Sequence, residues 1–190
     1  FVETGVWRGG SSVFARAVLR AYGEADDRKS YVCDSFKGLP PGDRDGLKDQ
    51  RDMGWDGMPY LEVSDKIVVD AFRKYSLLDS NVVFVKGYFA DSMAPLADEV
   101  MGPEGRKLSV MRLDGDMYQS TVDVLYRLYD RLSVGGYVII DDWFGFPAQD
   151  ACREFFEAHG INPEIVRIDR LSAYWRKVED IEVQKWRYDQ

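Results

Sequence analysis

The chain has 190 residues, 45% of them hydrophobic, and its 33 acidic against 25 basic residues give a net charge of −8. This length and apolar content predict one folded domain over residues 1–190 and exclude an intrinsically disordered protein. The excess of acidic residues, and the lack of a cluster of Lys and Arg residues in the sequence, argue against a nucleic-acid-binding surface. No apolar run approaches the roughly 18 residues that a membrane span needs.

The cysteine content and the start of the sequence bear on where the protein works. Cys33 and Cys152 are too few for a disulfide framework, which indicates a reducing compartment and predicts a cytoplasmic protein. The sequence enters a strand-like pattern at Phe1, without an initiator Met or a signal peptide. We therefore expect N-terminal elements of the domain to be missing from this sequence.

A glycine-containing turn follows the first strand-like residues. Residues 1–3 read as the end of a strand, and the apolar spacing of residues 11–22 predicts a helix. Gly5, Gly9 and Gly10 therefore lie on a strand-to-helix turn, where backbone can approach a ligand and the helix N-terminus favours anionic groups. The spacing is not G-x-G-x-x-G, which disfavours a nicotinamide cofactor, and a tight connection without a ligand explains the turn equally well.

The second predicted strand, residues 30–34, ends in Asp34. In dinucleotide-binding folds, an acid at this strand end accepts hydrogen bonds from ribose hydroxyls. An N-cap or Asx-turn at Asp34 or Ser35 is an equally good explanation.

Residues 37–60 are rich in Gly, Pro and charged residues, and a connection of this length predicts a lid, a binding loop or an oligomer contact. A helix over residues 62–75 follows.

The third predicted strand, residues 82–85, is followed by Gly87 and a short helix. Asp91 or Ser92 is expected to cap this helix, because both residue types satisfy free N–H groups at a helix start. Phe89 forms either part of the core or the flat wall of a base pocket.

Two apolar runs with a helix-length segment between them predict a strand–helix–strand unit with parallel strands. Acidic residues follow the runs 108–113 and 137–140 directly: Asp114 and Asp116 after the first, Asp141 and Asp142 after the second. Neighbouring parallel strands lie about 4.8 Å apart, so carboxylates leaving the same end converge on one small volume. Because such carboxylates repel one another, we expect a hard divalent cation such as Mg²⁺ at this edge of the sheet.

Other interpretations of these acids remain open. Asp116 stands three residues before Gln119 and could cap a helix, and any single Asp of the four could do the same. A phosphatase with an aspartyl nucleophile would use Asp114 and Asp116 as its Asp-x-Asp pair, with Asp141 and Asp142 holding Mg²⁺. The haloacid dehalogenase class, however, carries that pair after its first strand, whereas here it follows the fourth.

The last elements complete an α/β pattern. Residues 147–160 predict a helix that ends at Gly160, and residues 165–168 and 173–177 predict an antiparallel strand pair. About seven strands alternating with helices indicate a doubly wound α/β sheet, whose ligands bind outside the carboxyl ends of the strands. The single histidine, His159, stands at the C-terminal end of a helix, where a positive charge stabilises the helix dipole. We therefore expect this structural role for His159 and not a catalytic one.

Four stretches of the sequence carry a family resemblance. They are residues 3–10 (ETGVWRGG), 34–40 (DSFKGLP), 113–118 (LDGDMY) and 135–143 (GGYVIIDDW), in this order. Together they resemble the macrocin O-methyltransferase (TylF-type) family, whose members methylate sugar hydroxyls of natural products such as macrolides. The resemblance implies a Rossmann-like class I methyltransferase sheet, a glycosylated small-molecule substrate and a homo-oligomer.

The resemblance also implies S-adenosylmethionine and Mg²⁺ as cofactors. Asp114, Asp141 and Asp142 would be the metal ligands, and Asp116 the general base that takes the proton from the sugar hydroxyl. The residues implied for the cofactor are Glu3, Gly5 and Ser12 at the methionine end, Asp34 at the ribose and Gly87 and Phe89 at the adenine, with Thr4 and Ser35 beside them. A methyltransferase fold that has lost activity and serves as a scaffold is the non-enzymatic alternative.

Overall fold

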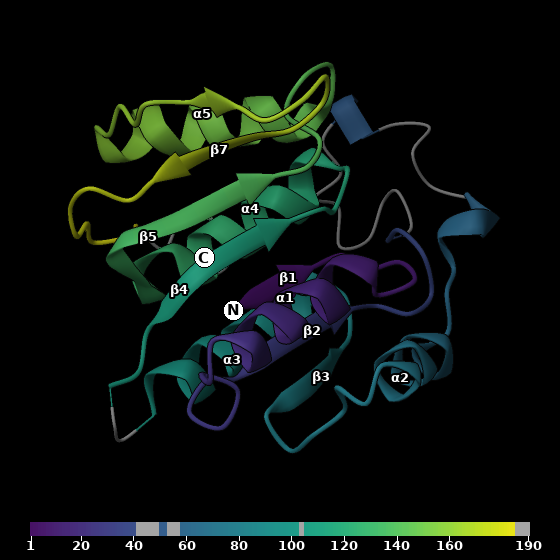
Figure 1. The fold of residues 1–190 in the computed structure, drawn as a ribbon. Helices are drawn as coiled ribbons and strands as arrows, with labels where there is room; N and C mark the ends of the chain where they lie inside the picture. The colour runs from purple at the N-terminus through teal and green to yellow at the C-terminus, as the bar shows by residue number, and fades with distance from the viewer. Residues whose placement is uncertain (41–49, 53–57, 103–104, 185–190) are drawn as a thin grey trace.

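The structure, a computed structural model, describes residues 1–40, 50–52, 58–102 and 105–184, so the predicted 37–60 loop lies partly outside it. Within these residues, seven strands form one sheet in the order β3-β2-β1-β4-β5-β7-β6 (Figure 1). The strands are β1 (Val2–Thr4), β2 (Ser30–Asp34), β3 (Val82–Lys86), β4 (Leu108–Leu113), β5 (Leu132–Ile140), β6 (Val166–Arg167) and β7 (Ala173–Arg176). The helices are α1 (Gly10–Ala21), α2 (Asp65–Lys74), α3 (Phe89–Met101), α4 (Tyr118–Leu128) and α5 (Pro147–His159), with short 3-10 helices η2 (Gln50–Asp52), η3 (Pro59–Leu61) and η4 (Tyr129–Arg131). None of the helices described here is long and apolar enough to cross a membrane.

Side-chain alternation along the strands divides the core between the two faces of the sheet. In β2, Tyr31 and Cys33 belong to one buried cluster and Val32 to another, as the period of two requires. The first cluster includes Phe155 and other side chains of α3, α4 and α5, and the second includes Phe72 and other side chains of α1 and α2. Both faces are therefore covered by helices, which is what a parallel sheet needs.

The strand order reverses between β1 and β4. β1 pairs in parallel with both β2 and β4, and β4 pairs in parallel with β5. Ligands of a doubly wound sheet bind outside the carboxyl ends of the strands at such a reversal. β7 lies antiparallel between β5 and β6, so the predicted seven-stranded sheet with an antiparallel last pair is confirmed.

The prediction of a short helix capped by Asp91 or Ser92 was wrong. α3 begins earlier, at Phe89, and has 13 residues. The Ser92 hydroxyl donates instead to the Tyr88 carbonyl at 2.9 Å, within the first turn. Asp91 also lies in this turn, where its negative charge suits the positive end of the helix dipole.

β5 begins at Leu132, earlier than the predicted strand at residues 137–140, and contains two glycines before that apolar run. Gly135 has a φ of 86°, and its N–H donates to the Lys177 carbonyl at 2.7 Å. A Cβ on Gly136 would lie 2.9 Å from the Ser109 carbonyl oxygen. The pairing register with β4 shifts at this point, so the glycines permit a β-bulge rather than ending the strand.

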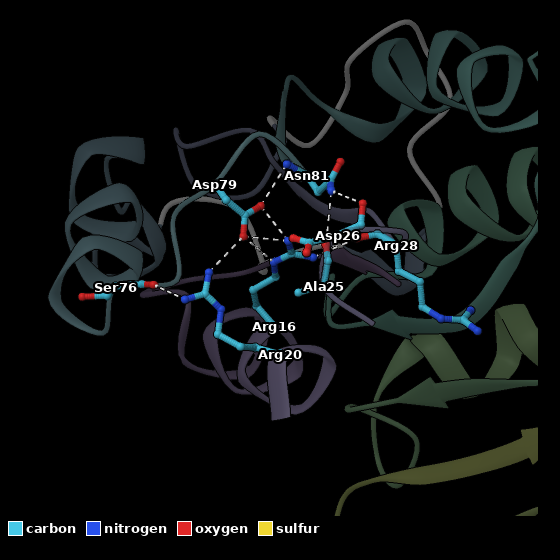
Figure 2. A network of polar contacts seen from close by, with 8 residues as sticks. All are labelled: Arg16, Arg20, Ala25, Asp26, Arg28, Ser76, Asp79 and Asn81. Carbon is cyan, nitrogen blue, oxygen red and sulfur yellow. Dashed lines mark hydrogen bonds and ion pairs between the residues drawn. The ribbon is translucent and has the colours of Figure 1, made fainter. Parts of the chain in front are cut away.

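A buried arginine fixes the opposite edge of the sheet, where the strands begin (Figure 2). The Arg16 side chain on α1 is fully buried and lies 2.6 Å from Asp79 in an ion pair. It also donates to the Arg28 and Ala25 carbonyls at 2.8 and 2.7 Å, while the Asn81 amide donates to the same Ala25 carbonyl. These contacts join the segments that precede β2 and β3, and they leave the carboxyl edge free for the site.

Candidate active site

A cavity of about 390 Å³ lies at the carboxyl ends of β1, β2, β4 and β5. Its lining from the first half of the sheet includes Gly5 and Trp7 after β1, Asp34 and Ser35 at β2, and Tyr88 and Phe89 at the start of α3. Its lining from the second half includes Asp114, Gly115, Asp116, Asp141 and Asp142. The glycine turn, the acid that ends β2 and the acidic strand tips thus share one space.

Gly5 sets how closely the ends of β1 and β4 approach each other. It has a φ of 87°, and a Cβ built on it would lie 1.8 Å from the Asp114 carbonyl oxygen. The Asp114 N–H donates to the Thr4 carbonyl at 2.8 Å, which continues the pairing beyond β4. The turn after β1 therefore packs directly against the first acidic residue, and only glycine fits there.

Three carboxylates converge at the tips of β4 and β5. Leu113 pairs with Ile140, so Asp114 and Asp141, the residues that follow them, lie side by side. One carboxylate oxygen from each of Asp114, Asp141 and Asp142 lies within 4.8 Å of the other two. Three oxygens at this spacing can coordinate one divalent cation.

Burial and repulsion raise the pKa values of three acids in the cavity, Asp114, Asp116 and Asp142. The pKa of Asp142 rises to about 8, first through burial and then through the charges of Asp116, Asp114 and Asp141. Burial and the charges of Asp114 and Asp141 raise the pKa of Asp116 to about 6. Burial also raises the pKa of Asp114, against the attraction of Arg112. Carboxylates held in this way favour a proton or a cation.

Arg112 is a residue of the site that the sequence analysis missed. Its Nη1 lies 2.7 Å from Glu3 Oε1 and 2.7 Å from Asp114 Oδ2, and its Nη2 donates to Asp141 Oδ1. The negative charge of the acidic residues, for which we expected a cation, is therefore partly balanced by this guanidinium. Its position two residues before Asp114 on a strand was the available signal, because side chains at i and i+2 share a face.

Three of the predicted cofactor residues are buried and are not part of the cavity lining. Glu3 is 1% exposed, and its carboxylate accepts hydrogen bonds from the Ser12 hydroxyl and from Arg112. Its pKa rises to about 7 because burial outweighs the attraction of Arg112. Thr4 and Ser12 are also buried. Glu3 and Ser12 are thus bonded to each other outside the cavity, whereas Thr4, the next residue of β1, points to the opposite face of the sheet.

The other predicted cofactor residues, except Gly87, line the cavity. Asp34 Oδ2 accepts the Val6 N–H at 2.8 Å and Oδ1 accepts the Phe36 N–H at 2.7 Å, so the Asx-turn considered as the alternative is present beside the cavity. The Ser35 hydroxyl is used locally and donates to the Gly38 carbonyl at 2.6 Å. Asp34 therefore both fixes its own loop and faces the cavity.

Asp52 is a second residue that the sequence analysis did not identify. Its carboxylate is fully buried and accepts the backbone N–H groups of Tyr118 at 2.6 Å and Gln119 at 2.9 Å. These are the first two N–H groups of α4, so Asp52 from η2 caps this helix and Asp116 does not. The guanidinium of Arg51 lies 3.7 Å from the centre of the Tyr118 ring. The η2 segment is thereby held against the helix that follows the acidic turn.

The fold and the site together define the class of protein. A seven-stranded α/β sheet with β7 antiparallel between β5 and β6, and with a cavity at the reversal of strand order, is that of a Rossmann-like class I methyltransferase. The chain belongs to the macrocin-O-methyltransferase (TylF) family, whose family model matches residues 1–177. The predicted family is confirmed, and the phosphatase interpretation of Asp114 and Asp116 is set aside.

Known relatives are similar over most of this chain. Mycinamicin III 3''-O-methyltransferase of Micromonospora griseorubida is 41% identical over 179 residues, which are 93% of this chain and 67% of the relative. The 8-demethyl-8-(2,3-dimethoxy-alpha-L-rhamnosyl)-tetracenomycin-C 4'-O-methyltransferase of Streptomyces olivaceus is 44% identical over 176 residues, 92% of this chain and 64% of the relative. The solved structure of the O-methyltransferase NovP has a TM-score of 0.84 and 39% identity, covering 94% of this chain and 72% of that one. This chain spans about two thirds of the length of these curated relatives.

Proposed function

We propose that the protein transfers a methyl group from S-adenosylmethionine to a sugar hydroxyl of a glycosylated natural product, with Mg²⁺ bound at the acidic strand tips. The observation that carries the proposal is that one cavity is lined by Gly5 and Asp34 on one side and by Asp114, Asp116 and Asp141 on the other. The names of the relatives support the substrate class, since one relative acts on a compound with a rhamnosyl group.

Gly5, Asp34 and Phe89 would hold S-adenosylmethionine, which supplies an electrophilic methyl group when bound. Gly5 keeps this part of the wall free of side chain, and the apolar ring of Phe89 offers a surface for adenine. Asp34 Oδ2 accepts the Val6 N–H and retains a second lone pair for a ribose hydroxyl, while Oδ1 accepts the Phe36 N–H and lies 3.5 Å from the Ser35 hydroxyl. The remaining predicted residues, Glu3, Thr4, Ser12, Ser35 and Gly87, would shape this half of the site around them.

Asp114, Asp141 and Asp142 would hold Mg²⁺. The buried Oδ2 of Asp142 has no hydrogen-bond partner in the described part of the chain, so a cation is a fitting partner for it. A divalent cation, when bound, lowers the pKa of a coordinated hydroxyl. With a pKa of about 6, Asp116 is mostly ionised at neutral pH, so its carboxylate can take the proton from that hydroxyl.

Two aromatic side chains at the cavity suit a sugar acceptor. Trp7 and Tyr60 both line the cavity, and they remain 48% and 66% exposed. The Trp7 indole N–H donates to the Tyr60 carbonyl at 3.1 Å, which holds their two segments together. Exposed aromatic surface beside a cavity is typical of a binding site and can contact the apolar face of a sugar ring.

Asp34→Ala is expected to raise the Kd for S-adenosylhomocysteine by about 10- to 150-fold, the equivalent of 1.5–3 kcal/mol for hydrogen bonds to a charged acceptor. Isothermal titration calorimetry measures this directly. Ser35→Ala is the matched control, because its hydroxyl already bonds within its own turn, and it should weaken binding less. An unchanged Kd in Asp34→Ala would refute the ribose role.

Mg²⁺ is expected to bind about tenfold more tightly per pH unit as the pH rises from 6 toward 8. The reason is competition, because the pKa of Asp142 is about 8 and its proton must leave before the carboxylate can coordinate the cation. Calorimetric titrations at several pH values give the affinity, and buffers of different ionisation enthalpy report the released proton. Equal affinity at pH 6 and pH 8, without proton release, would contradict the assignment.

The proposed reaction is tested by mass spectrometry. The purified protein is incubated with S-adenosylmethionine, Mg²⁺ and a set of demethylated glycosides of polyketides. We expect S-adenosylhomocysteine and a glycoside methylated on its sugar, with turnover lost in chelator and restored by Mg²⁺. Cofactor binding without methylation of any glycoside would instead support a scaffold, and full turnover in excess chelator would exclude the metal.

The proposal also covers the surroundings in which the protein works. The free thiols of Cys33 and Cys152 are both buried, which supports a reducing compartment such as the cytoplasm. Phe14 on α1 and Tyr22, which directly follows this helix, are 71% and 81% exposed, which supports a homo-oligomer that would cover them. Light scattering of the purified protein measures the oligomeric state.

A further inference from the structure

The strand register places one arginine among the acidic residues of the site. Arg112 on β4 is paired with Glu3 on β1 and with Ile139 on β5. Residues paired across parallel strands share a face of the sheet, and so do residues two apart along one strand. Arg112 therefore lies on the same face as Glu3, as Asp114 two residues later, and as Asp141 two residues after Ile139.

The contacts of Arg112 follow from this register. Its side chain is 16% exposed, and its two terminal nitrogens contact one oxygen each of Glu3, Asp114 and Asp141. On the two aspartates, these contacts use Oδ2 of Asp114 and Oδ1 of Asp141. The second oxygen of each carboxylate is outside the contact. The guanidinium is a planar fork of donors with fixed geometry, so it restricts the orientation of both carboxylates at once.

We infer that Arg112 is a positioning residue for the divalent cation, because it holds Asp114 and Asp141 side by side with one oxygen of each left for coordination. This inference rests on the metal site of the proposed function and adds a residue outside the three acids. The buried Glu3 carboxylate anchors the other side of the guanidinium, and the Ser12 hydroxyl bonds to Glu3 in turn. The orientation of the acidic pair is thereby fixed from β1 and α1.

The direction in which Mg²⁺ affinity changes when Arg112 is replaced separates this role from a purely electrostatic one. Arg112→Met removes the guanidinium and keeps an unbranched side chain. If Arg112 only added positive charge, its loss would tighten Mg²⁺ binding, because the repulsion between two cations would disappear. If it positions the carboxylates, its loss should weaken Mg²⁺ binding by about 10- to 100-fold, as for other groups that orient metal ligands. Arg112→Lys keeps the charge without the planar fork and should lie between wild type and Arg112→Met.

The measurement is the Mg²⁺ Kd by isothermal titration calorimetry, with thermal unfolding to confirm that each variant is folded. Arg112→Met removes the ion-pair partner of the buried Glu3 carboxylate, so the double variant Arg112→Met/Glu3→Gln avoids a buried charge without a counter-ion and has the same expected loss. Arg20→Met is the matched control, since it removes an arginine paired with Asp79 at the other edge of the sheet and should leave the Kd unchanged (Figure 2). Unchanged or tighter Mg²⁺ binding without Arg112 would overturn this role alone. A wild-type protein that binds no Mg²⁺ would overturn this role together with the proposed metal site.

Discussion

Asp116→Asn is expected to lower kcat for methyl transfer by about 10²–10⁴-fold, the usual contribution of a general base. Asparagine has nearly the same size, and it tolerates the left-handed conformation in which Asp116 is held, with a φ of 57°. It cannot accept the proton of the hydroxyl. The Mg²⁺ Kd should change far less than kcat, because Asp116 is outside the group of three converging carboxylates. Steady-state kinetics with both substrates saturating gives kcat, and calorimetry gives the Kd.

The pH dependence of kcat distinguishes a base from a residue that only shapes the cavity. With Mg²⁺ kept saturating at every pH, so that its weaker binding in acid does not contribute, wild-type kcat should fall as the pH is lowered through the pKa of Asp116. The reason is that the protonated carboxyl cannot take a proton. This pKa is about 6 without metal, and a bound cation would lower it further. Asp116→Asn should lose this acidic limb. An unaltered limb, or turnover close to that of wild type, would rule out Asp116 as the base.

Gly5→Ala is expected to destabilise the protein by about 3 kcal/mol or more, through overpacking and backbone strain together. The added Cβ would lie 1.8 Å from the Asp114 carbonyl oxygen, and Gly5 has a φ of 87°. The atoms that the Cβ would meet, the carbonyl oxygen and carbon of Asp114, belong to the backbone at the end of a paired strand, so they cannot rotate away. At about 2–4 °C per kcal/mol for a domain of this size, the melting temperature should fall by roughly 6–12 °C. Thermal unfolding followed by circular dichroism measures the fall.

Gly10→Ala is the control for this experiment. Gly10 lies in the same turn, at the first residue of α1, and a Cβ there has no atom within 4 Å. Alanine favours a helix over glycine, so this variant should be as stable as wild type or slightly more stable. If Gly5→Ala and Gly10→Ala unfold at the same temperature, the close approach of β1 to β4 at Gly5 is not as described.

The position of the acidic residues could be predicted from the sequence because local rules fix it. Buried runs before Asp114 and Asp141 indicate strands, and parallel pairing of those strands brings the residues after them together. The same alternation, taken two residues back from Asp114, also applies to Arg112 and would have placed it in the site. The start of β5 was missed for a different reason, since Gly135 and Gly136 permit a bulge in a strand as readily as they end one.

Contacts between distant segments could not be predicted in the same way. Asp52 caps α4 from 66 residues before Tyr118, and no local pattern selects it among the 33 acidic residues of the chain. Glu3 shows a second limit. The family resemblance implied a cofactor contact for Glu3, but its side chain bonds to Ser12 and Arg112 and is not part of the cavity lining. Periodicity gives the face of the sheet to which a side chain points, and tertiary packing decides whether it reaches the cavity.

A crystal structure with Mn²⁺ and S-adenosylhomocysteine tests the central claim most directly. Mn²⁺ takes the same oxygen ligands as Mg²⁺ and gives an anomalous signal that locates it. We predict one anomalous peak in the cavity, coordinated by Asp114, Asp141 and Asp142, with S-adenosylhomocysteine in the same cavity against Gly5 and Asp34. A cavity with bound S-adenosylhomocysteine but no peak, or a peak whose ligands include neither Asp114 nor Asp141, would contradict this account.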